Sequence, residues 1–259
     1  MEPIIFRIEA GIATIKLNRP KTFNSVTRQL ALSFISALSD CEHNPDVRVV
    51  IITGEGKAFC AGQDLVEVTD PDKNPGFDKI LEEHYAPVIK KIREIEKPVI
   101  AKVNGVAAGA GANIAIACDI VMAVESASFI QAFSAIGLIP DSAGTFFLPR
   151  LVGFQKASAL AMLGDKVSAK EAERMGMIYQ YYPAEEFDEA VQKVAVKLSK
   201  APTKGLGMTK RAFNQSLSND LYQQLDVEND LQIAASNTAD YKEGVDAFVN
   251  KRKPVFKGE

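Results

Sequence analysis

Residues 104–145 read NGVAAGAGANIAIACDIVMAVESASFIQAFSAIGLIPDSAGT, an apolar stretch that is rich in small residues and poor in charge. From residue 105 to residue 112 it carries glycine or alanine at every position except Val106, so its backbone can approach a ligand closely. If a helix begins near Ala110, its first amide groups lack partners within the helix and point outward as donors. Asp141 lies near the end of the stretch in apolar surroundings, where burial would raise its pKa. We expect these donors and this carboxylate to face one pocket.

Strands and helices alternate along the chain up to about residue 150. The patterns predict strands over residues 4–8, 12–17, 47–53, 98–103 and 120–124, and helices over residues 27–41 and 79–96. The run VRVVIIT at residues 47–53 is typical of a strand that is buried on both faces. Such alternation predicts an α/β fold with parallel strands. Residues 66–77 are polar and contain two prolines, so we expect a mobile surface segment there.

The second part of the chain is predicted to be mainly helical. Helices are expected over residues 168–175, 187–198, 204–216, 221–236 and 240–250, with a short strand over 178–182. Ser168, with Glu171 three residues later, is a typical N-cap. A basic tail, KRKPVFKGE, occupies residues 251–259.

Composition disfavours several classes of function. Hydrophobic residues make up 47% and charged residues 24%, as in ordinary soluble proteins, and the net charge of −3 offers no basic field for nucleic acid or anionic lipid. The three cysteines, Cys41, Cys60 and Cys118, are odd in number and widely spaced, which favours reduced thiols over a disulfide framework. The first residues lack an apolar signal core, and the longest charge-free run, 103–118, is too short and glycine-rich to span a membrane. We expect a cytoplasmic protein without nucleic-acid or membrane partners.

Two turns of small residues each follow a buried strand. The turn at 105–111 lacks the G-x-G-x-x-G spacing and the later acidic residue of a dinucleotide site, so by itself it is explained by close helix–strand packing. The turn at 57–65, KAFCAGQDL, likewise presents Ala61 and Gly62 with little side-chain bulk. Such turns at the carboxyl ends of neighbouring parallel strands lie where open α/β sheets bind ligands, and two convergent N–H groups would form an oxyanion hole. A tight loop with Asp64 as a helix cap is the alternative.

Four motifs carry a family resemblance: AFCAGQDL at 58–65, PVIAKVNGVAAGAGA at 98–112, CDIVMAVESASF at 118–129 and AFSAIGLIPDSAGTFFLPR at 132–150. They resemble the crotonase superfamily, the enoyl-CoA hydratase/isomerase group, and the similarity extends from residue 16 to residue 254. The resemblance implies a spiral core of ββα units over residues 1–195 and a helical C-terminal region over 196–259 that builds a homotrimer or a dimer of trimers. It also implies an acyl-CoA thioester substrate whose carbonyl is held by the backbone N–H groups of Gln63 and Ala110. No cofactor is implied, because coenzyme A is part of the substrate.

The chain departs from the hydratases of this group at two positions. Their two glutamates correspond to Asn113 and Phe133, and neither residue can exchange a proton at neutral pH, which disfavours hydration. Asp141 matches the position where acyl-CoA isomerases with GLIPD followed by GT have their proton-moving aspartate. A 1,3-proton shift needs one base, provided that the enolate is held. The chain resembles in particular the 1,2-epoxyphenylacetyl-CoA isomerases of phenylacetate degradation, which also shift double bonds in 3-enoyl-CoA.

The sequence therefore predicts an acyl-CoA isomerase with Asp141, Gln63 and Ala110 as catalytic residues. Two alternatives stay open: Asp141 caps a short helix near Thr145, or the protein binds acyl-CoA without turning it over. The predicted substrate-binding residues are Ala61, Gly62, Asp64, Leu65, Tyr85, Gly109, Asn113 and Phe133, and the predicted coenzyme A-binding residues are Lys21, Phe23 and Lys251, the last from a neighbouring subunit.

Other chemistries have less support. The 4-chlorobenzoyl-CoA dehalogenases resemble the chain at Asp141 but rely on a tryptophan, which is missing from this sequence, and a histidine. His84 could approach the site from the 79–96 helix, although a surface position is expected. Cys41 and His43 lack a second ligand pair for zinc, and no G-x-S-x-G motif supports a hydrolase.

Overall fold

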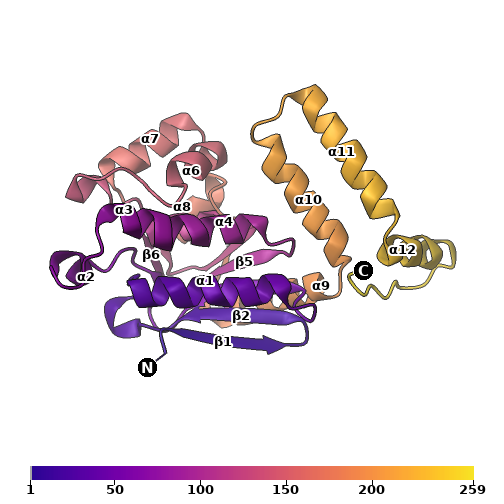
Figure 1. Ribbon diagram of the computed structural model, residues 1–259, viewed down its shortest axis with the longest axis horizontal. Helices are drawn as coiled ribbons and strands as arrows, with labels where there is room; N and C mark the ends of the chain where they lie inside the picture. Colours follow the sequence, from indigo (N-terminus) through magenta and orange to yellow (C-terminus); the bar gives the residue numbers. More distant parts are fainter. Residues whose placement is uncertain (1) are drawn as a thin grey trace.

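The chain forms two β-sheets surrounded by helices, as the computed structural model of residues 2–259 shows (Figure 1). The six-stranded sheet has the order β1-β2-β3-β5-β7-β10, and the four-stranded sheet has the order β4-β6-β8-β9. The six strands are β1 Ile4–Glu9, β2 Ile12–Leu17, β3 Val49–Gly54, β5 Val99–Val103, β7 Ile120–Val124 and β10 Gln180–Tyr182. The four are β4 Ala58–Cys60, β6 Val106–Ala108, β8 Ser128–Ile130 and β9 Val167–Ser168.

Three times in succession, two neighbouring strands in the sequence are divided between the two sheets. β3 and β4, β5 and β6, and β7 and β8 each contribute the first strand to the large sheet and the second to the small one. β2, β3, β5, β7 and β10 pair in parallel, as do β4, β6 and β8, while β1 joins β2 as an antiparallel hairpin. The chain therefore advances as a spiral, and the predicted α/β fold with parallel strands is confirmed.

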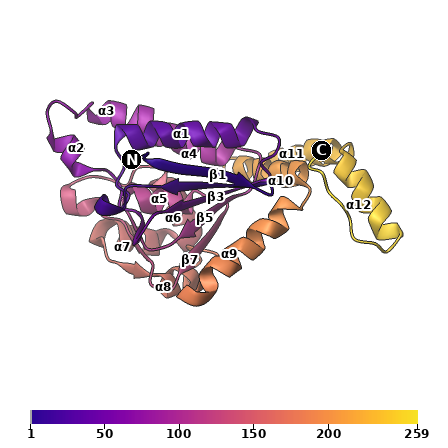
Figure 2. The same cartoon turned by 90° about the horizontal axis from the view of Figure 1, so that it is seen from below.

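Helices cover both faces of the large sheet. α1 Arg28–His43 and α4 Ala86–Glu94 lie on one face, and α9 Ala184–Ser199 crosses the other (Figure 2). β3 is buried along its whole length between these layers, which explains why its sequence is continuously apolar. The remaining helices are α2 Leu65–Thr69, α3 Phe77–Lys79, α5 Ala110–Ile116, α6 Gly144–Val152, α7 Phe154–Leu163, α8 Ala169–Arg174, α10 Thr203–Ser216, α11 Leu221–Ser236 and α12 Ala239–Val249, with 3-10 turns η1 Pro20–Thr22 and η3 Ser134–Ile136.

Most predicted elements are present with small shifts at their ends. The strands at 12–17 and 120–124 and the helix at 221–236 have the predicted bounds, and Ser168 caps α8 by accepting from Glu171 N–H. The segment at 66–77 lies at the surface as predicted, with no buried residue, and α2 and α3 occupy its ends. The predicted helix at 79–96 contains a π-helical turn, η2 Ile80–Tyr85, between α3 and α4.

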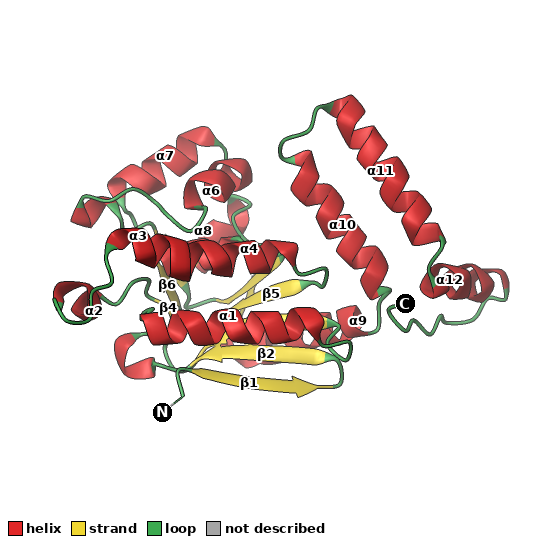
Figure 3. Cartoon of the chain, viewed as in Figure 1, coloured by secondary structure: helices red, strands yellow, loops and turns green. Residues whose placement is uncertain are grey.

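The C-terminal helices project from one end of the core (Figure 3). α10 is attached through Lys210, whose buried ammonium group forms an ion pair with Asp119 over 2.8 Å and donates to the Ile92 carbonyl. The final residues fold back, because the Asp240 carboxylate accepts from the N–H groups of Lys257 and Gly258. The predicted domain boundary at residue 195 falls inside α9. Within residues 2–259, no helix has the length and apolar character needed to cross a membrane.

Candidate active site

The two turns of small residues lie against each other. β4 pairs with β6, with Cys60 opposite Ala107, so the chain after each strand leaves the sheet at the same edge. A Cβ added to Gly62 would lie 3.0 Å from the Ala108 carbonyl oxygen and 3.4 Å from the Ala110 amide nitrogen. Only glycine permits this approach, and Gly62 also has a positive φ of 84°. The backbone around Gln63 is therefore in contact with the start of α5.

The main-chain directions around Gln63 favour a convergent pair of donors. Val26 N–H donates to the Gly62 carbonyl, and Asp64 N–H donates to the Val26 carbonyl. Residues 62–64 therefore direct one edge of their backbone toward Val26. Since alternate N–H groups of an extended chain point to opposite sides, the Gln63 N–H is directed away from Val26. Ala110 is the first residue of α5, and its N–H therefore has no acceptor within that helix.

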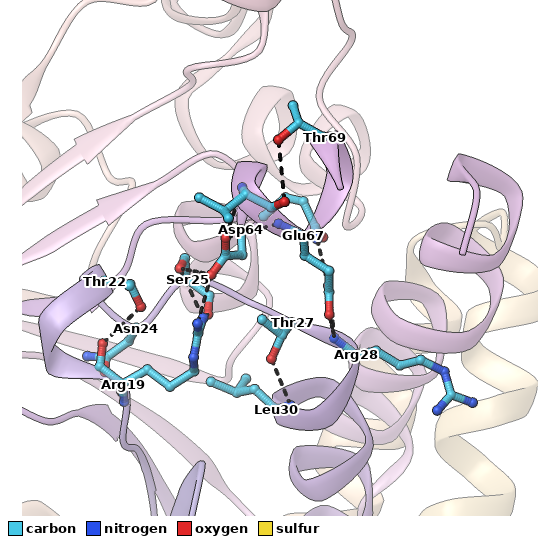
Figure 4. A network of polar contacts seen from close by, with 12 residues as sticks. Arg19, Thr22, Asn24, Ser25, Thr27, Arg28, Leu30, Asp64, Glu67 and Thr69 are labelled. Carbon is cyan, nitrogen blue, oxygen red and sulfur yellow. Dashed lines mark hydrogen bonds and ion pairs between the residues drawn. The ribbon is translucent and has the colours of Figure 1, made fainter. Parts of the chain in front are cut away.

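Asp64 holds the Gln63 turn in place (Figure 4). One of its oxygens accepts from the N–H groups of Val66 and Glu67 and caps α2, while the other forms an ion pair with Arg19 over 2.8 Å and accepts from Ser25. Burial acts to raise the pKa of the Asp64 carboxyl, but the Arg19 and Ser25 hydrogen bonds outweigh it and leave this pKa below its usual range. Asp64 is thus the N-cap of α2, and both of its carboxylate oxygens hold the loop in place without excluding the two main-chain donors.

The Gln63 side chain is held from two directions. Tyr85 Oη donates to Gln63 Oε1 over 2.8 Å, and Gln63 Nε2 donates to Glu67 Oε2 over 3.4 Å. Tyr85 ends the π-helical turn and is almost completely buried, which raises its phenol pKa well above the usual value and keeps the donor proton in place. Tyr85, which is predicted to bind substrate, therefore fixes the Gln63 side chain through its hydroxyl group.

Asp141 lies on a strained turn just before α6. Ser142 and Ala143, both non-glycine residues, have positive φ angles of 49° and 58°, and Gly144 N–H closes the turn on the Asp141 carbonyl over 2.8 Å. Consecutive left-handed residues cost about 1–2 kcal/mol each and often mark functional sites. The N-cap of α6 is Ala143, without a side-chain cap, so the alternative that the Asp141 side chain caps a short helix is not what the structure shows. Its carboxylate accepts from Ser142 Oγ over 2.9 Å instead.

The environment of Asp141 suits a proton-transfer group. The residue is half-buried, and this burial raises the pKa of its carboxyl, with the Ser142 hydrogen bond offsetting part of the shift. A raised carboxyl pKa brings its proton affinity closer to that needed in neutral solution. An apolar cavity of about 510 Å³ adjoins the same turn through Pro140 and Gly144 and is lined further by Leu148 and Met162.

Asn113 and Phe133 join the two parts of the site. Asn113 Nδ2 donates to the Asp141 carbonyl over 2.9 Å, and Gln131 Nε2 donates to Asn113 Oδ1 over 2.8 Å. Phe133 is 6% exposed, and its Cζ lies 3.9 Å from where a Cβ on Gly109 would be. Sequence reasoning missed Gln131, although a buried glutamine in an apolar stretch was a visible signal.

The other predicted residues lie at different depths. Phe23 is 52% exposed and receives the Ala61 N–H bond at its carbonyl, which places Phe23 and the exposed Lys21 beside the Gln63 loop. The Leu65 side chain is exposed at the start of α2. Lys251 follows α12, which lies at the opposite end of the molecule from α2 in both views (Figures 1 and 2).

His84 does not occupy the expected surface position. Its side chain is fully buried, and neither ring nitrogen has a hydrogen-bond partner in the described part of the chain. Burial lowers the pKa of the His84 imidazole. The charged groups near it are Glu67, Arg28 and Glu83. Across residues 2–259, histidine, cysteine, aspartate and glutamate side chains form no cluster of three that could hold a metal ion.

Comparisons of sequence and of structure identify relatives of this chain. The sequence matches the family described as Enoyl-CoA hydratase/isomerase over residues 7–259. It is 43% identical over 263 residues to 1,2-epoxyphenylacetyl-CoA isomerase of Escherichia coli strain K12, with 100% of both chains covered. It is 40% identical to a Rhodobacter capsulatus protein named "Probable enoyl-CoA hydratase", with 98% of both chains covered. The crystal structure of an enoyl-CoA hydratase from Polaromonas sp. JS666 matches with a TM-score of 0.90 and 32% identity, covering 98% of this chain and 99% of that one.

Proposed function

The chain belongs to the enoyl-CoA hydratase/isomerase family, and we propose that within this family it is an acyl-CoA isomerase. One observation carries the proposal: the turn whose main-chain carbonyl accepts from Asn113 on α5 bears the Asp141 carboxyl, which is half-buried with a raised pKa. By the family resemblance, Asn113 and Phe133 correspond to the hydratase glutamates, and neither is a carboxylate here. The name of the Escherichia coli relative supports an isomerase, and the name of the Rhodobacter capsulatus relative keeps hydration as the competing activity to be tested.

The reaction would begin with the thioester carbonyl oxygen between the N–H groups of Gln63 and Ala110. These donors would stabilise the negative charge that develops on the oxygen when the α-carbon loses a proton, and such a donor typically contributes about 3–4 kcal/mol. Asp141 would take that proton and return it to the γ-carbon, which moves the double bond from the 3-position to the 2-position. The carboxylate is regenerated, no electrons are gained or lost, and no cofactor is required.

The acyl group is proposed to be apolar. The cavity that reaches the Asp141 turn at Pro140 and Gly144 has a volume of about 510 Å³, which lies within the range of small-molecule pockets, and its lining is mostly aliphatic. Phe133 adds an aromatic wall next to Gly109. We therefore propose two substrates. One is 3-enoyl-CoA, and the other is 2-(1,2-epoxy-1,2-dihydrophenyl)acetyl-CoA of phenylacetate breakdown, which the name of the Escherichia coli relative suggests.

Self-association is a further part of the proposal. Leu221 and Tyr222 at the start of α11 and Phe248 in α12 are largely exposed, and large apolar side chains exposed along the projecting helices favour contact with another chain. A homotrimer or a dimer of trimers would cover them, and sedimentation analysis distinguishes these states from a monomer.

The test uses purified protein and a 3-enoyl-CoA thioester. Isomerisation produces a conjugated 2-enoyl thioester, which is followed by its ultraviolet absorbance. Asp141→Asn should lower kcat by about 10²- to 10⁴-fold, the usual contribution of general acid–base catalysis. The control Asp46→Asn changes an exposed aspartate outside the site and should retain the wild-type rate.

Three results would contradict the proposal. An unchanged rate in Asp141→Asn would remove this residue from the mechanism. Preferential hydration of 2-enoyl-CoA by the wild type would identify a hydratase. Saturable acyl-CoA binding without turnover, and without exchange of the α-proton in deuterated water, would identify a non-catalytic acyl-CoA-binding protein.

A further inference from the structure

A chain of buried amide groups connects Asp141 to the helix that carries the Ala110 donor. Gln131 Nε2 donates to Asn113 Oδ1 over 2.8 Å, and Asn113 Nδ2 donates to the Asp141 carbonyl over 2.9 Å. Asn113 is 0% exposed and Gln131 is 5% exposed, so water does not compete for these bonds. This series of amide hydrogen bonds runs from Gln131, just after β8, through Asn113 on the first turn of α5 to the turn before α6.

The orientation of both amides follows from one fact about Asp141. A main-chain carbonyl can only accept, so Asn113 must turn its nitrogen toward Asp141 and its oxygen toward Gln131. Gln131 must then present its nitrogen to Asn113, which leaves Gln131 Oε1 buried without a partner among residues 2–259. Leaving a buried acceptor unpaired costs free energy, so this arrangement is retained at the expense of stability.

The Asp141 turn has little freedom to move relative to Asn113. The Asp141 carbonyl accepts from both Gly144 N–H and Asn113 Nδ2. A Cβ added to Gly144 would lie only 2.2 Å from Asn113 Nδ2, so the turn packs directly on the amide. The two left-handed residues, Ser142 and Ala143, therefore persist because the contacts around them hold them in place.

We infer that Asn113, aligned by Gln131, is a positioning residue that sets the Asp141 carboxyl at a fixed place relative to the Ala110 N–H donor. Asn113 is on the first turn of α5, and its N–H donates to the Gly109 carbonyl, so the anchor of the base and the oxyanion donor share one rigid element. The role rests on the proposed isomerase function, since a fixed distance between donor and base matters for the proton shift.

A carboxylate at position 113 cannot perform this role. An ionised aspartate or glutamate has no donor for the Asp141 carbonyl, and its negative charge would face that carbonyl directly. Residue 113 must supply one donor and one acceptor in this buried place. Asn113 therefore has two effects: it leaves the position of a hydratase glutamate without a carboxylate, and it holds the turn that bears the proposed base, Asp141.

The first experiment separates hydrogen bonding from side-chain shape. Asn113→Asp is nearly isosteric but lacks the donor when ionised, and Asn113→Ala removes the whole amide. Both should lower kcat by about 10- to 100-fold with KM within about twofold, because a displaced base affects the transition state more than substrate binding. Gln131→Met should act in the same direction with a smaller loss. The control Ile114→Val, also buried on α5, should retain wild-type kcat.

A second experiment does not depend on activity. The Asp141 carboxyl is followed by carbon-13 NMR during a pH titration of the wild type, Asn113→Ala and Ile114→Val, with its signal identified from its loss in Asp141→Asn. Release of the turn should hydrate the carboxyl and move its pKa toward the ordinary aspartate value in Asn113→Ala but not in Ile114→Val.

The outcomes distinguish the two proposals. An inactive wild type with the expected shift in the Asp141 titration overturns the isomerase function and leaves the positioning role intact. An active wild type whose Asn113→Asp variant keeps its kcat, or whose Asn113→Ala variant keeps the Asp141 titration curve, overturns the positioning role. A loss of kcat that merely follows a loss of folded protein, measured by circular dichroism, also overturns it.

Discussion

The substitution Gly111→Ala should disable the site by separating the two turns that carry its donors. Gly111 is the second residue of α5, and a Cβ added there would lie 2.2 Å from the Cys60 carbonyl oxygen. That distance is roughly 1 Å shorter than van der Waals contact, and the atom it meets is backbone rather than a flexible side-chain tip. The Gln63 turn must therefore move away from α5 by a comparable amount.

A displacement of this size predicts a measurable loss of rate. Misplacement of reacting groups by 1 Å costs about 10²-fold, which corresponds to about 2.7 kcal/mol of transition-state free energy. We expect kcat/KM for 3-enoyl-CoA isomerisation to fall by about that factor in Gly111→Ala. Acyl-CoA binding, measured by calorimetry, should weaken much less, because the ground-state carbonyl gains less from the donors than the enolate does.

The matched control is Gly205→Ala. Gly205 is also a helical glycine, in α10, but the nearest atom to an added Cβ is 3.9 Å away on Pro202. Replacing it should leave kcat/KM unchanged and stabilise the fold by about 0.4–1 kcal/mol through the unfolded chain. The reasoning is refuted if folded Gly111→Ala keeps kcat/KM within about threefold of the wild type, or if Gly205→Ala loses rate to the same extent.

Three further predictions concern the ionisable side chains of Tyr85, Asp141 and His84. Tyr85→Phe removes the hydroxyl that donates to Gln63, and kcat/KM should fall about fivefold, the equivalent of one neutral hydrogen bond. Asp141→Asn should raise the melting temperature at pH 7 more than at pH 4, because the raised pKa means that the wild type loses stability as pH rises through it, by about 1.4 kcal/mol per pKa unit. His84→Leu should reduce the stability that the protein loses on acidification from pH 7 to pH 5. Because burial lowers the pKa of His84, the unfolded chain binds a proton at this residue more readily than the folded chain, so acid favours unfolding in the wild type.

Each of these has its own contrary result. A Tyr85→Phe enzyme with the wild-type rate would show that the Gln63 side chain needs no anchor. A melting-temperature difference between Asp141→Asn and the wild type that does not change with pH would show that the carboxyl pKa is not raised. A His84→Leu protein with the wild-type slope of stability against pH would assign the acid sensitivity to other groups.

Much of the fold was predictable because it depends on patterns within a few residues. The strand at 12–17 has alternating burial, and β3 is apolar throughout, so period and composition identified both. Ser168 and Asp64 were recognised as caps because a cap acts on amides only two or three residues away. β4, β6 and β8 were missed as strands because three residues are too few to show a period.

His84 was expected at the surface because of its polar ring, although its spacing along the helix indicates otherwise. His84 and Tyr85 lie four residues before the buried Val88 and Ile89, so a regular helix would place all four side chains on one face. Both His84 and Tyr85 are buried at the end of the π-helical turn.

The sequence by itself determined which chemical groups the site contains: main-chain donors in two small-residue turns and a carboxylate at Asp141, with no carboxylate at 113 or 133. Only the tertiary structure decided that Gly62 contacts Ala110, that Tyr85 holds Gln63, and that Asn113 and Gln131 hold the Asp141 turn. The physical reason is that residue type and period are local properties, whereas hydrogen bonds between residues 18 to 28 positions apart depend on strand register and on the left-handed turn at Ser142 and Ala143.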